Sequence, residues 1–493
     1  MRRLMTWVGG GLAVILAAVV VLAGVVAVNT LRQSSRQIQV DALARADVDE
    51  QGAAARLSEA IRFRTISNFL NPEQDADALR GLRALIAASF PAFHAVAKRE
   101  IVGGHSLLYT WEGSEPAAKP IALLAHQDVV PVAPGTEKDW QHPPFDGVIA
   151  DGFIWGRGSW DDKGNLYAIL EAVEQMAKDG FRPTRTVYLA FGHDEEVSGQ
   201  RGAKEIAALL PSRGVKLDFV LDEGLLITDG IMKGLDKPAA MIGIAEKGYA
   251  TLVLTARATP GHSSMPPRDT AIGMMAAALA RLEDHSLPAR VRGAVGEMFA
   301  TLAPEMSGFN RVVLSNLWLF KPLLVREFDK SGPTRAMVRT TTALTIFNAG
   351  DKDNVLPGNA EATVNFRLLP GDTQDSVTAH VRETVRNERI TIAPFLGNTD
   401  PPPVTGTASA GYRILNRTIR EIFPDVIVAP GLMIAATDSR HYAGLTDNIF
   451  RFSPVRATSD DLKRFHGTNE RLSIANYADM IRFYRRLIQS SAG

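Results

Sequence analysis

The stretch Gly156-Arg157-Gly158-Ser159-Trp160-Asp161-Asp162-Lys163-Gly164 leads directly into a segment of periodic apolar residues. From 163 to 178 the apolar residues recur at helical spacing, and Gly180 follows as a stop signal. The sequence therefore predicts a helix over 163–178. The carboxylates of Asp161 and Asp162 precede its first turn, where acidic side chains also serve as ordinary helix caps.

Short apolar runs bounded by turn residues flank this helix on both sides. They cover residues 120–124, 186–191 and 217–221, and this pattern predicts buried parallel strands. Strands that alternate with helices indicate an α/β sheet. The side chains that follow these strands are His126, Glu195, Glu196 and Asp222. Because open α/β sheets form their sites beyond the carboxyl ends of their strands, we expect these residues to share one site.

A paired zinc site would use the residue types that gather at these positions. Such a site needs neutral imidazoles and hard carboxylates, one of them bridging, and a further carboxylate that transfers protons. The predicted metal ligands are His126, Asp161, Glu196, Asp222 and His466. Asp161 is the predicted bridge and Glu195 the predicted general base. Asp128 is placed to accept the second N–H of the His126 ring.

Each of these residues also has an ordinary structural interpretation. A histidine at a strand end is usually a hydrogen-bonded core or surface residue, and the acids at 195–196 can begin a solvated helix. Gly156 and Gly158 suggest a dinucleotide-binding loop, but the third glycine and the acidic ribose partner are misplaced. The last metal-binding carboxylate also stays open between two neighbours. Asp222 is favoured over Glu223 because it comes first after the strand.

The order of these motifs resembles the M20 metallopeptidase family, specifically its branch of carboxypeptidase S and the secreted N-acyl-amino-acid hydrolases. The matching motifs lie at 126–131, 140–145, 156–164, 194–196, 221–224, 261–264, 354–357, 437–440 and 466–467. The resemblance implies a zinc-peptidase-like hydrolase with two Zn²⁺ ions per subunit. The same His and carboxylate set also accepts Co²⁺ or Mn²⁺.

The resemblance further implies the substrate and the groups that bind it. Arg440 corresponds to the arginine that binds the free α-carboxylate of a substrate. His262 corresponds to a histidine that steadies the oxyanion, in the family often from the partner subunit of a homodimer. The expected function is a carboxypeptidase that releases a C-terminal amino acid from peptides. The alternatives are an N-acyl-amino-acid amidohydrolase and a binding protein that has lost the chemistry.

A second unit over 247–396 interrupts the catalytic domain, which takes residues 49–246 and 397–493. Its predicted elements are strands at 248–258, 340–348, 360–368 and 389–394 and helices at 269–283 and 373–385. This order is the split βαβ arrangement of a ferredoxin-like α+β domain. The resemblance implies that this inserted unit is a lid that also mediates dimerisation.

The second unit contains an insertion of its own at 286–339. A helix is expected near 291–302, and a polar loop after Phe328. The catalytic domain resumes after the prolines at 401–403 and ends in an amphipathic helix over 474–488.

Composition excludes several classes of protein. The 54 Lys and Arg residues balance the 54 Asp and Glu residues, so the overall field would not attract nucleic acid, and no nucleic-acid partner is expected. The chain has no cysteine, which excludes thiolate ligands, Cys nucleophiles and disulfides. Any metal ligands must therefore be His, Asp and Glu.

The N-terminal segment carries no charge from Leu4 to Val28. A helix of that length spans roughly 37 Å, more than the hydrocarbon core of about 30 Å. Arg2 and Arg3 precede it, so the positive-inside tendency predicts a single-pass signal anchor at 4–28 with the catalytic domain on the extracytoplasmic, periplasmic or lumenal, side. A cleaved signal peptide is the alternative. Residues 29–48 are polar and are expected to form a stalk.

Overall fold

The computed structural model of the chain describes residues 2–493, and side chains from residue 11 onward. Its largest element in that range is a mixed sheet of eight strands in the order β1-β2-β6-β3-β7-β16-β8-β15. The strands are β1 (Lys98–Val102), β2 (Ser106–Trp111), β3 (Ile121–His126), β6 (Val187–Gly192), β7 (Val220–Thr228), β8 (Ala239–Glu246), β15 (Ile427–Met433) and β16 (Ile449–Ala457). The neighbours β6, β3, β7 and β16 run parallel. The predicted α/β class is confirmed.

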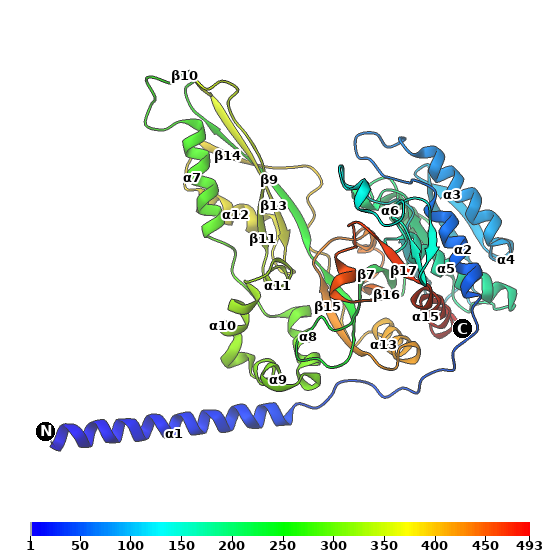
Figure 1. The fold of residues 1–493 in the computed structure, drawn as a ribbon, viewed down its shortest axis with the longest axis horizontal. Helices are drawn as coiled ribbons and strands as arrows, with labels where there is room; N and C mark the ends of the chain where they lie inside the picture. The colour runs from blue at the N-terminus through cyan, green and yellow to red at the C-terminus, as the bar shows by residue number, and fades with distance from the viewer. Residues whose placement is uncertain (1) are drawn as a thin grey trace.

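Helices cover both faces of this sheet (Figure 1). They are α2 (Glu50–Ile61), α3 (Ala76–Ser89), α4 (Pro91–Val96), α5 (Lys163–Lys178), α6 (Ala203–Ser212), α13 (Ala410–Ile422) and α15 (Ile474–Ala492). In β3, Leu123 belongs to the core cluster that includes α2, α5 and α15, whereas Leu124 belongs to the cluster that includes α6. A strand buried on both faces is apolar throughout, which explains the continuous run at 120–124.

The predicted helix over 163–178 is observed as α5, with the same boundaries. The predicted strand over 217–221 is wrong at both ends, because β7 begins at Val220, continues to Thr228 and contains Asp222. The pairing of β7 with β16 is irregular after Asp222, which breaks the apolar run without ending the strand.

A second sheet has four antiparallel strands in the order β11-β13-β9-β14. Along the chain its elements are β9 (Gly248–Arg257), α7 (Ala271–Asp284), β11 (Thr341–Asn348), β13 (Asn359–Leu368), α12 (Gln374–Val385) and β14 (Ile390–Pro394). The observed order is therefore βαββαβ, and α7 and α12 share one apolar core with the strands. This unit projects away from the large sheet, and its outer end carries the paired strands β10 (Gly261–His262) and β12 (Val355–Leu356) (Figure 1).

The segment between α7 and β11 is helical over most of its length. It contains α8 (Gly293–Leu302), α9 (Gly308–Ser315), α10 (Leu317–Phe328) and α11 (Gly332–Val338). The expected helix near 291–302 is confirmed, but the polar loop expected after Phe328 is wrong, because α11 forms there with Pro333 in its first turn. The inner sides of α8 and α10 pack into the core of the large sheet.

Helix α1 (Arg2–Arg32) is followed by an extended segment that lies on the catalytic body. In the described part of the chain, one helix has the length and composition of a membrane span, at Gly11–Arg32, a test that a signal sequence also passes. The Gln37 side chain donates to Val428 O at 3.0 Å and accepts from Val428 N at 2.8 Å. Leu43 N donates to Glu421 O at 3.1 Å. The segment after α1 is thus hydrogen bonded to the body at several points.

Three short strands bring the C-terminal part of the catalytic domain against the stretch at 156–164. They form a sheet in the order β17-β5-β4, with β4 (Val148–Ala150), β5 (Phe153–Trp155) and β17 (Arg471–Ser473). The remaining short elements are α14 (Ser459–Leu462) and the 3-10 turns η1 (Glu137–Asp139), η2 (Glu195–Val197), η3 (Ala303–Glu305) and η4 (Asp438–Tyr442).

Candidate metal centre

His126 is the last residue of β3, and its ring is buried. Nδ1 lies 3.0 Å from the backbone oxygen of Asp128 and 3.3 Å from its carboxylate. A proton on Nδ1 serves these acceptors and leaves the lone pair on Nε2, which faces the site. Nε2 lies 3.0 Å from Asp161 Oδ1.

Asp161 lies between two imidazoles from distant parts of the chain. Its Oδ1 contacts His126, and its Oδ2 lies 2.8 Å from His466 Nε2. Burial opposes the charge on Asp161, but the two histidines outweigh it and hold the pKa of Asp161 below its ordinary value. A carboxylate with one oxygen toward each of two imidazoles has the geometry of a bridging ligand.

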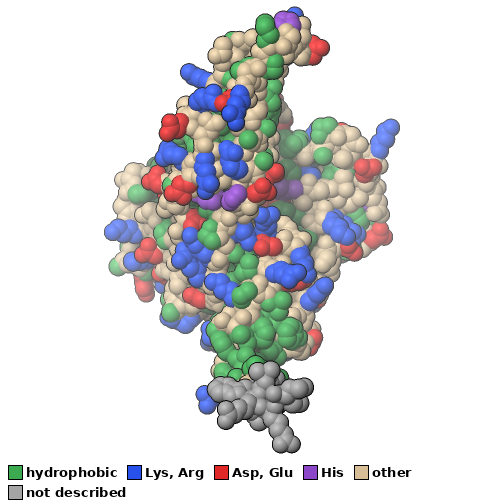
Figure 2. Space-filling model, turned by 90° about the vertical axis from the view of Figure 1, so that its left-hand side faces the viewer, with side chains coloured by type: hydrophobic (Ala, Val, Ile, Leu, Met, Phe, Trp, Pro, Cys, Tyr) green, Lys and Arg blue, Asp and Glu red, His purple; other side chains and the backbone are tan. Residues whose placement is uncertain are grey.

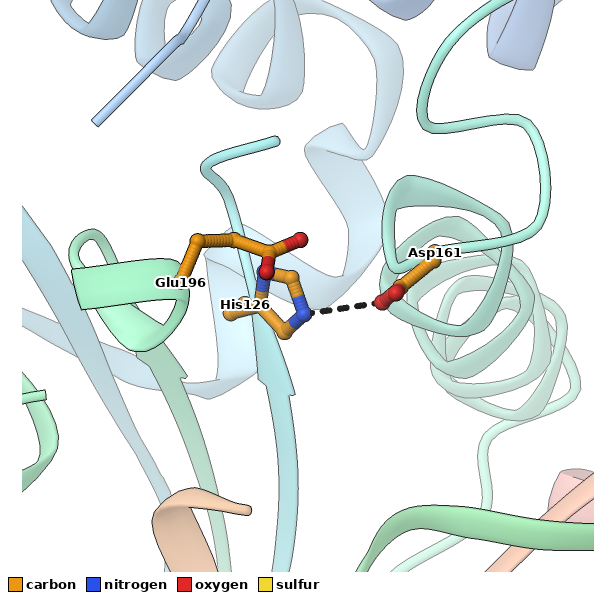
Figure 3. A group of neighbouring side chains, drawn as sticks. All are labelled: His126, Asp161 and Glu196. Atoms are coloured by element: carbon orange, nitrogen blue, oxygen red, sulfur yellow. Dashed lines mark hydrogen bonds and ion pairs between the residues drawn. The ribbon is translucent and has the colours of Figure 1, made fainter. Parts of the chain in front are cut away.

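Glu196 completes a compact group with His126 and Asp161 (Figure 3). One ligand atom from each of the three residues lies within 4.8 Å of the others. Glu196 Oε1 lies 3.4 Å from His466 Nε2, yet it is buried and accepts no hydrogen bond from any residue that the structure describes. Burial, and then the nearby Asp161, raise the pKa of Glu196.

The Asp128 carboxylate connects the end of β3 to the turn that follows β6. It accepts hydrogen bonds from the backbone N–H of Glu195 at 3.2 Å and of Glu196 at 3.1 Å. These two hydrogen bonds fix the backbone from which both glutamate side chains project. Asp128 therefore holds His126, Glu195 and Glu196 together at one edge of the sheet.

Glu195 lies beside the group of three, in the 3-10 turn η2. Burial raises the pKa of Glu195 well above its ordinary value, and the Asp438 carboxylate adds to the effect. Arg440 borders the same turn, since its Nη2 donates to Ser198 O at 3.0 Å. The structure therefore brings Glu195 and Arg440 to the same edge of the sheet.

Asp222 and Glu223 have different surroundings although they are adjacent. Asp222 Oδ1 accepts from Glu223 N at 2.9 Å, and Oδ2 accepts from Ser439 N at 2.7 Å. In the pairing with β16, Asp222 is followed by Leu225, so Glu223 and Gly224 form a bulge. Burial raises the pKa of Asp222 to about 6, and burial with Asp161 raises the pKa of Glu223 well above its ordinary value.

Glu470 supports the stretch at 156–164, and the sequence interpretation did not single it out. The side chain is fully buried, and its Oε1 accepts hydrogen bonds from the backbone N–H of Gly158, Trp160 and Asp161 at 2.9, 2.9 and 3.1 Å. Three donors on one carboxylate oxygen fix the backbone that presents the Asp161 side chain.

The buried Arg157 links Glu470 to the His466 loop. Its Nη1 lies 2.6 Å from Glu470 Oε2, and its Nη2 donates to His466 O at 3.2 Å and Gly467 O at 3.1 Å. The Arg157–Glu470 pair therefore positions the backbone at Asp161 and at His466, and the side chains of these two residues are in contact through Asp161 Oδ2. The only sequence signal was the glycine on either side of Arg157. Trp160 packs edge-on against Phe465, with ring centroids 5.6 Å apart, and is itself buried.

His262 is not brought to this group within the chain. It lies in β10 at the outer end of the second sheet, away from the edge of the large sheet (Figure 1). The side chain is exposed, and its Nδ1 contacts Ser264 Oγ at 2.8 Å.

The donor set suits divalent cations on chemical grounds. Burial opposes the charged form of both histidines, but the neighbouring carboxylates raise the pKa of His466 to about 10 and that of His126 well above its ordinary value. Glu196 Oε1 has a free acceptor position at the same place. A cluster of buried carboxylates that favours positive charge, with imidazoles on both sides, is the environment in which Zn²⁺ binds.

The sequence of residues 122–490 matches the family model of peptidase family M20/M25/M40. This span contains His126, Asp161, Glu196 and His466. The chain belongs to this family. As an M20 family metallo-hydrolase it is an enzyme, and the metal dependence of the family agrees with the donor set described above.

Its similar proteins carry two kinds of name. The N-fatty-acyl-amino acid synthase/hydrolase PM20D1 of Xenopus tropicalis is 44% identical over 450 residues, which cover 90% of this chain and 87% of that protein. The probable carboxypeptidase S-like 2 of Dictyostelium discoideum is 42% identical over 473 residues, which cover 94% and 91%.

The fold matches solved structures of the family. The M20 metallo-carboxypeptidase Sso-CP2 from Sulfolobus solfataricus superposes with a TM-score of 0.64 at 19% identity, over 90% of this chain and 99% of that chain. The dinuclear metal-binding peptidase YXEP from Bacillus subtilis gives a TM-score of 0.56 at 11% identity, over 89% and 98%. At these identities the likeness concerns the fold.

Proposed function

We propose that this M20 hydrolase binds two Zn²⁺ ions and cleaves the amide bond before a free C-terminal amino acid. The observation that carries the proposal is the Asp161 carboxylate with one oxygen directed to each of two imidazoles, with Glu196 beside them. One cation would be held by His126 and the other by His466, with Asp161 shared between them.

The remaining metal-binding carboxylate is Asp222 or Glu223. The order along the chain favours Asp222. The contacts favour Glu223, because each Asp222 oxygen already accepts one backbone hydrogen bond, whereas Glu223 lies in the bulge and has no partner on β16. We expect Glu223→Gln to lower the number of tightly bound Zn²⁺ ions from two to one, as measured by inductively coupled plasma analysis after dialysis. The same loss in Asp222→Asn, with two Zn²⁺ ions retained in Glu223→Gln, would show that Asp222 is the ligand.

Bound Zn²⁺ would supply Lewis acidity and a lowered pKa for water. Glu195 takes the proton of the attacking water and returns it to the leaving amine. Asp128 keeps the His126 ring oriented and holds the Glu195 backbone. Arg440 binds the free carboxylate of the substrate through its planar guanidinium.

The second sheet acts as a lid in this proposal, and His262 steadies the oxyanion. Since His262 is at the outer end of that sheet, it would reach a site through closure of the lid or from a second copy of the chain in a homodimer. The N-terminal helix would anchor the protein in a membrane, with the catalytic body on the extracytoplasmic side.

Peptides are the first candidate substrates, in line with the carboxypeptidase S-like relative. The second candidate class is N-acyl amino acids, which the similarity to the N-fatty-acyl-amino acid synthase/hydrolase favours. Both classes end in the free α-carboxylate that Arg440 would bind, and both contain the amide bond that Glu195 would help to cleave.

The test is release of free amino acid by the full-length protein in detergent, with benzyloxycarbonyl-dipeptides and long-chain N-acyl amino acids offered in parallel. We expect turnover that a chelator abolishes and added Zn²⁺ restores. The preferred substrate separates the two classes. If the metal-loaded protein cleaves neither class, the selectivity assigned to Arg440 is wrong; if no metal binds, the site is a remnant in a binding protein.

A further inference from the structure

The helices α9 and α10 expose an apolar surface beside the N-terminal helix. Phe309 is 62% exposed, Trp318 59% and Leu323 46%. Trp318 and Leu323 lie about 140° apart around α10, on the two flanks of its outer side. We call these two residues and Phe309 the α9–α10 face. Helix α9 lies beside the C-terminal end of α1, and α10 follows α9 in the chain (Figure 1); apolar side chains gather at this end of the molecule (Figure 2). Large apolar side chains grouped on a surface usually mark a contact site.

The two helices are apolar on their inner side as well. Leu314 of α9 and Leu317 and Phe328 of α10 pack against the core of the large sheet. A surface helix of a soluble protein normally has one apolar stripe and an opposite polar face. Phe309 packs edge-on against Phe320, with ring centroids 6.0 Å apart, but the three residues of the face stay about half exposed or more, so packing among the described side chains covers only part of the α9–α10 face.

A buried amide joins this face to α1. Asn316, fully buried between α9 and α10, donates to Thr30 Oγ1 at 3.0 Å and to Val26 O at 3.3 Å. It accepts from Asn29 Nδ2 at 3.2 Å and from the Trp318 indole Nε1 at 3.3 Å. One side chain thus holds the end of α1 and an exposed residue of the face at a fixed separation.

The chain after α1 also stays at this place. Arg311 Nη2 of α9 donates to Gln33 O at 3.4 Å, and Gln37 is bonded to Val428. A bilayer that contained α1 would therefore have its surface next to α9 and α10.

We propose that the α9–α10 face is a second membrane contact, which lies in the boundary between headgroups and acyl chains of the bilayer that α1 crosses. This inference rests on the proposed anchor. Amphipathic helices bind in that layer through aromatic and aliphatic side chains, and Trp is enriched there. Residues 308–328 carry Arg311, Lys321 and Arg326 against Glu327, a net charge of +2 that favours anionic headgroups.

The absence of cysteine from the sequence makes the test direct. Single cysteines at Phe309, Trp318 and Leu323 would carry a nitroxide label in the full-length protein in lipid nanodiscs. Leu396 is the matched aqueous control, because it is 89% exposed and lies in the segment that leads from β14 back to the catalytic body. Val20 in α1 is the control for the anchor.

We expect collision with oxygen to exceed collision with a water-soluble nickel chelate at the three face positions and at Val20, and the reverse at Leu396. Trp318→Cys removes the hydrogen bond to Asn316, so Phe309→Cys and Leu323→Cys carry the test if that variant is unstable.

The outcomes separate the two claims. Face labels as accessible to nickel as Leu396, with Val20 in lipid, would overturn the second contact and leave the anchor intact. Val20 labels in water would remove the anchor and this inference with it. Dipolar broadening between face labels that persists without lipid would show that a second copy covers the face, which also overturns the inference.

Discussion

At the site edge of the large sheet the polar side chains are buried and hold one another, whereas the outer end of the second sheet carries side chains that face solvent. Asp128 binds the backbone of both glutamates, and Glu470 binds three backbone N–H groups. The His262 ring, by contrast, is hydrogen bonded only to its near neighbour Ser264 among the described residues, and Met265 is 78% exposed.

One chain therefore contains a pre-formed candidate metal site but not every group proposed for the reaction. Buried polar groups that satisfy one another keep their geometry in the absence of ligand. The exposed side chain of His262 has no such support, so the role proposed for it would need a substrate, a lid movement or a second copy to position it. The following predictions test that division.

The largest expected effect is on Glu195, at the buried edge. Glu195→Gln keeps the size and the backbone hydrogen bond to Asp128 but removes the proton acceptor, so kcat should fall about 10²–10⁴-fold with Zn²⁺ binding retained. Glu205→Gln, an exposed site on α6, is the control. Full activity in Glu195→Gln would show that Glu195 is not the general base.

His262→Ala should lower kcat about 10²–10³-fold if the residue steadies the oxyanion, with the free energy of unfolding unchanged because the side chain is exposed. The readout is steady-state kinetics together with urea unfolding. Mixing His262→Ala with Glu195→Gln protein tests for a second copy, because a dimer of the two variants regains activity at one of its sites. Wild-type kinetics in His262→Ala would show that His262 does not steady the oxyanion.

Glu470→Gln should weaken Zn²⁺ binding by about 10–100-fold, since partners that orient metal ligands contribute on this scale. It also leaves Arg157 buried without its charge partner, which should cost about 3–5 kcal/mol of stability. Competition with a fluorescent chelator and urea unfolding measure the two effects. The double change Arg157→Met with Glu470→Gln should recover part of the stability but not the Zn²⁺ affinity; recovery of both would mean that the pair has no positioning role.

The smallest expected effect is at Lys247, the residue between β8 and β9 that joins the two sheets. Nζ donates to Ala336 O at 3.0 Å and Arg339 O at 2.8 Å, and burial lowers the pKa of Lys247 to about 7 from an ordinary 10.5. Between these pH values the unfolded chain binds a proton that the folded chain lacks. The free energy of unfolding therefore gains a positive slope of at most about 1.4 kcal/mol per pH unit.

Lys247→Met removes that slope, so the difference in unfolding free energy between wild type and variant should grow in favour of wild type from pH 7 to pH 10. Urea unfolding at several pH values measures it. A difference that is independent of pH would show that Lys247 keeps its proton in the folded protein.

Local sequence patterns were enough to predict many elements, because apolar periodicity is decided by neighbours along the chain. Helix α5 and the βαββαβ order of the second sheet were predicted in this way. Helix α10 was missed because it has Pro322 inside it and apolar residues on more than one side, so no single periodic stripe stands out; α9 spans only eight residues, too few for a clear periodic pattern.

The class of fold and the reactive groups could be predicted from local sequence: strands followed by His and acidic residues, no thiols, and an apolar N-terminal helix. Which side chains meet depends on the tertiary structure. The bulge that separates Asp222 from Glu223, the Arg157–Glu470 pair across 313 positions of sequence, the place of His262 and the outward apolar face of α9 and α10 all depend on packing between distant segments. Such contacts leave no local periodic signal, because each residue forms them with a partner that is near only after folding.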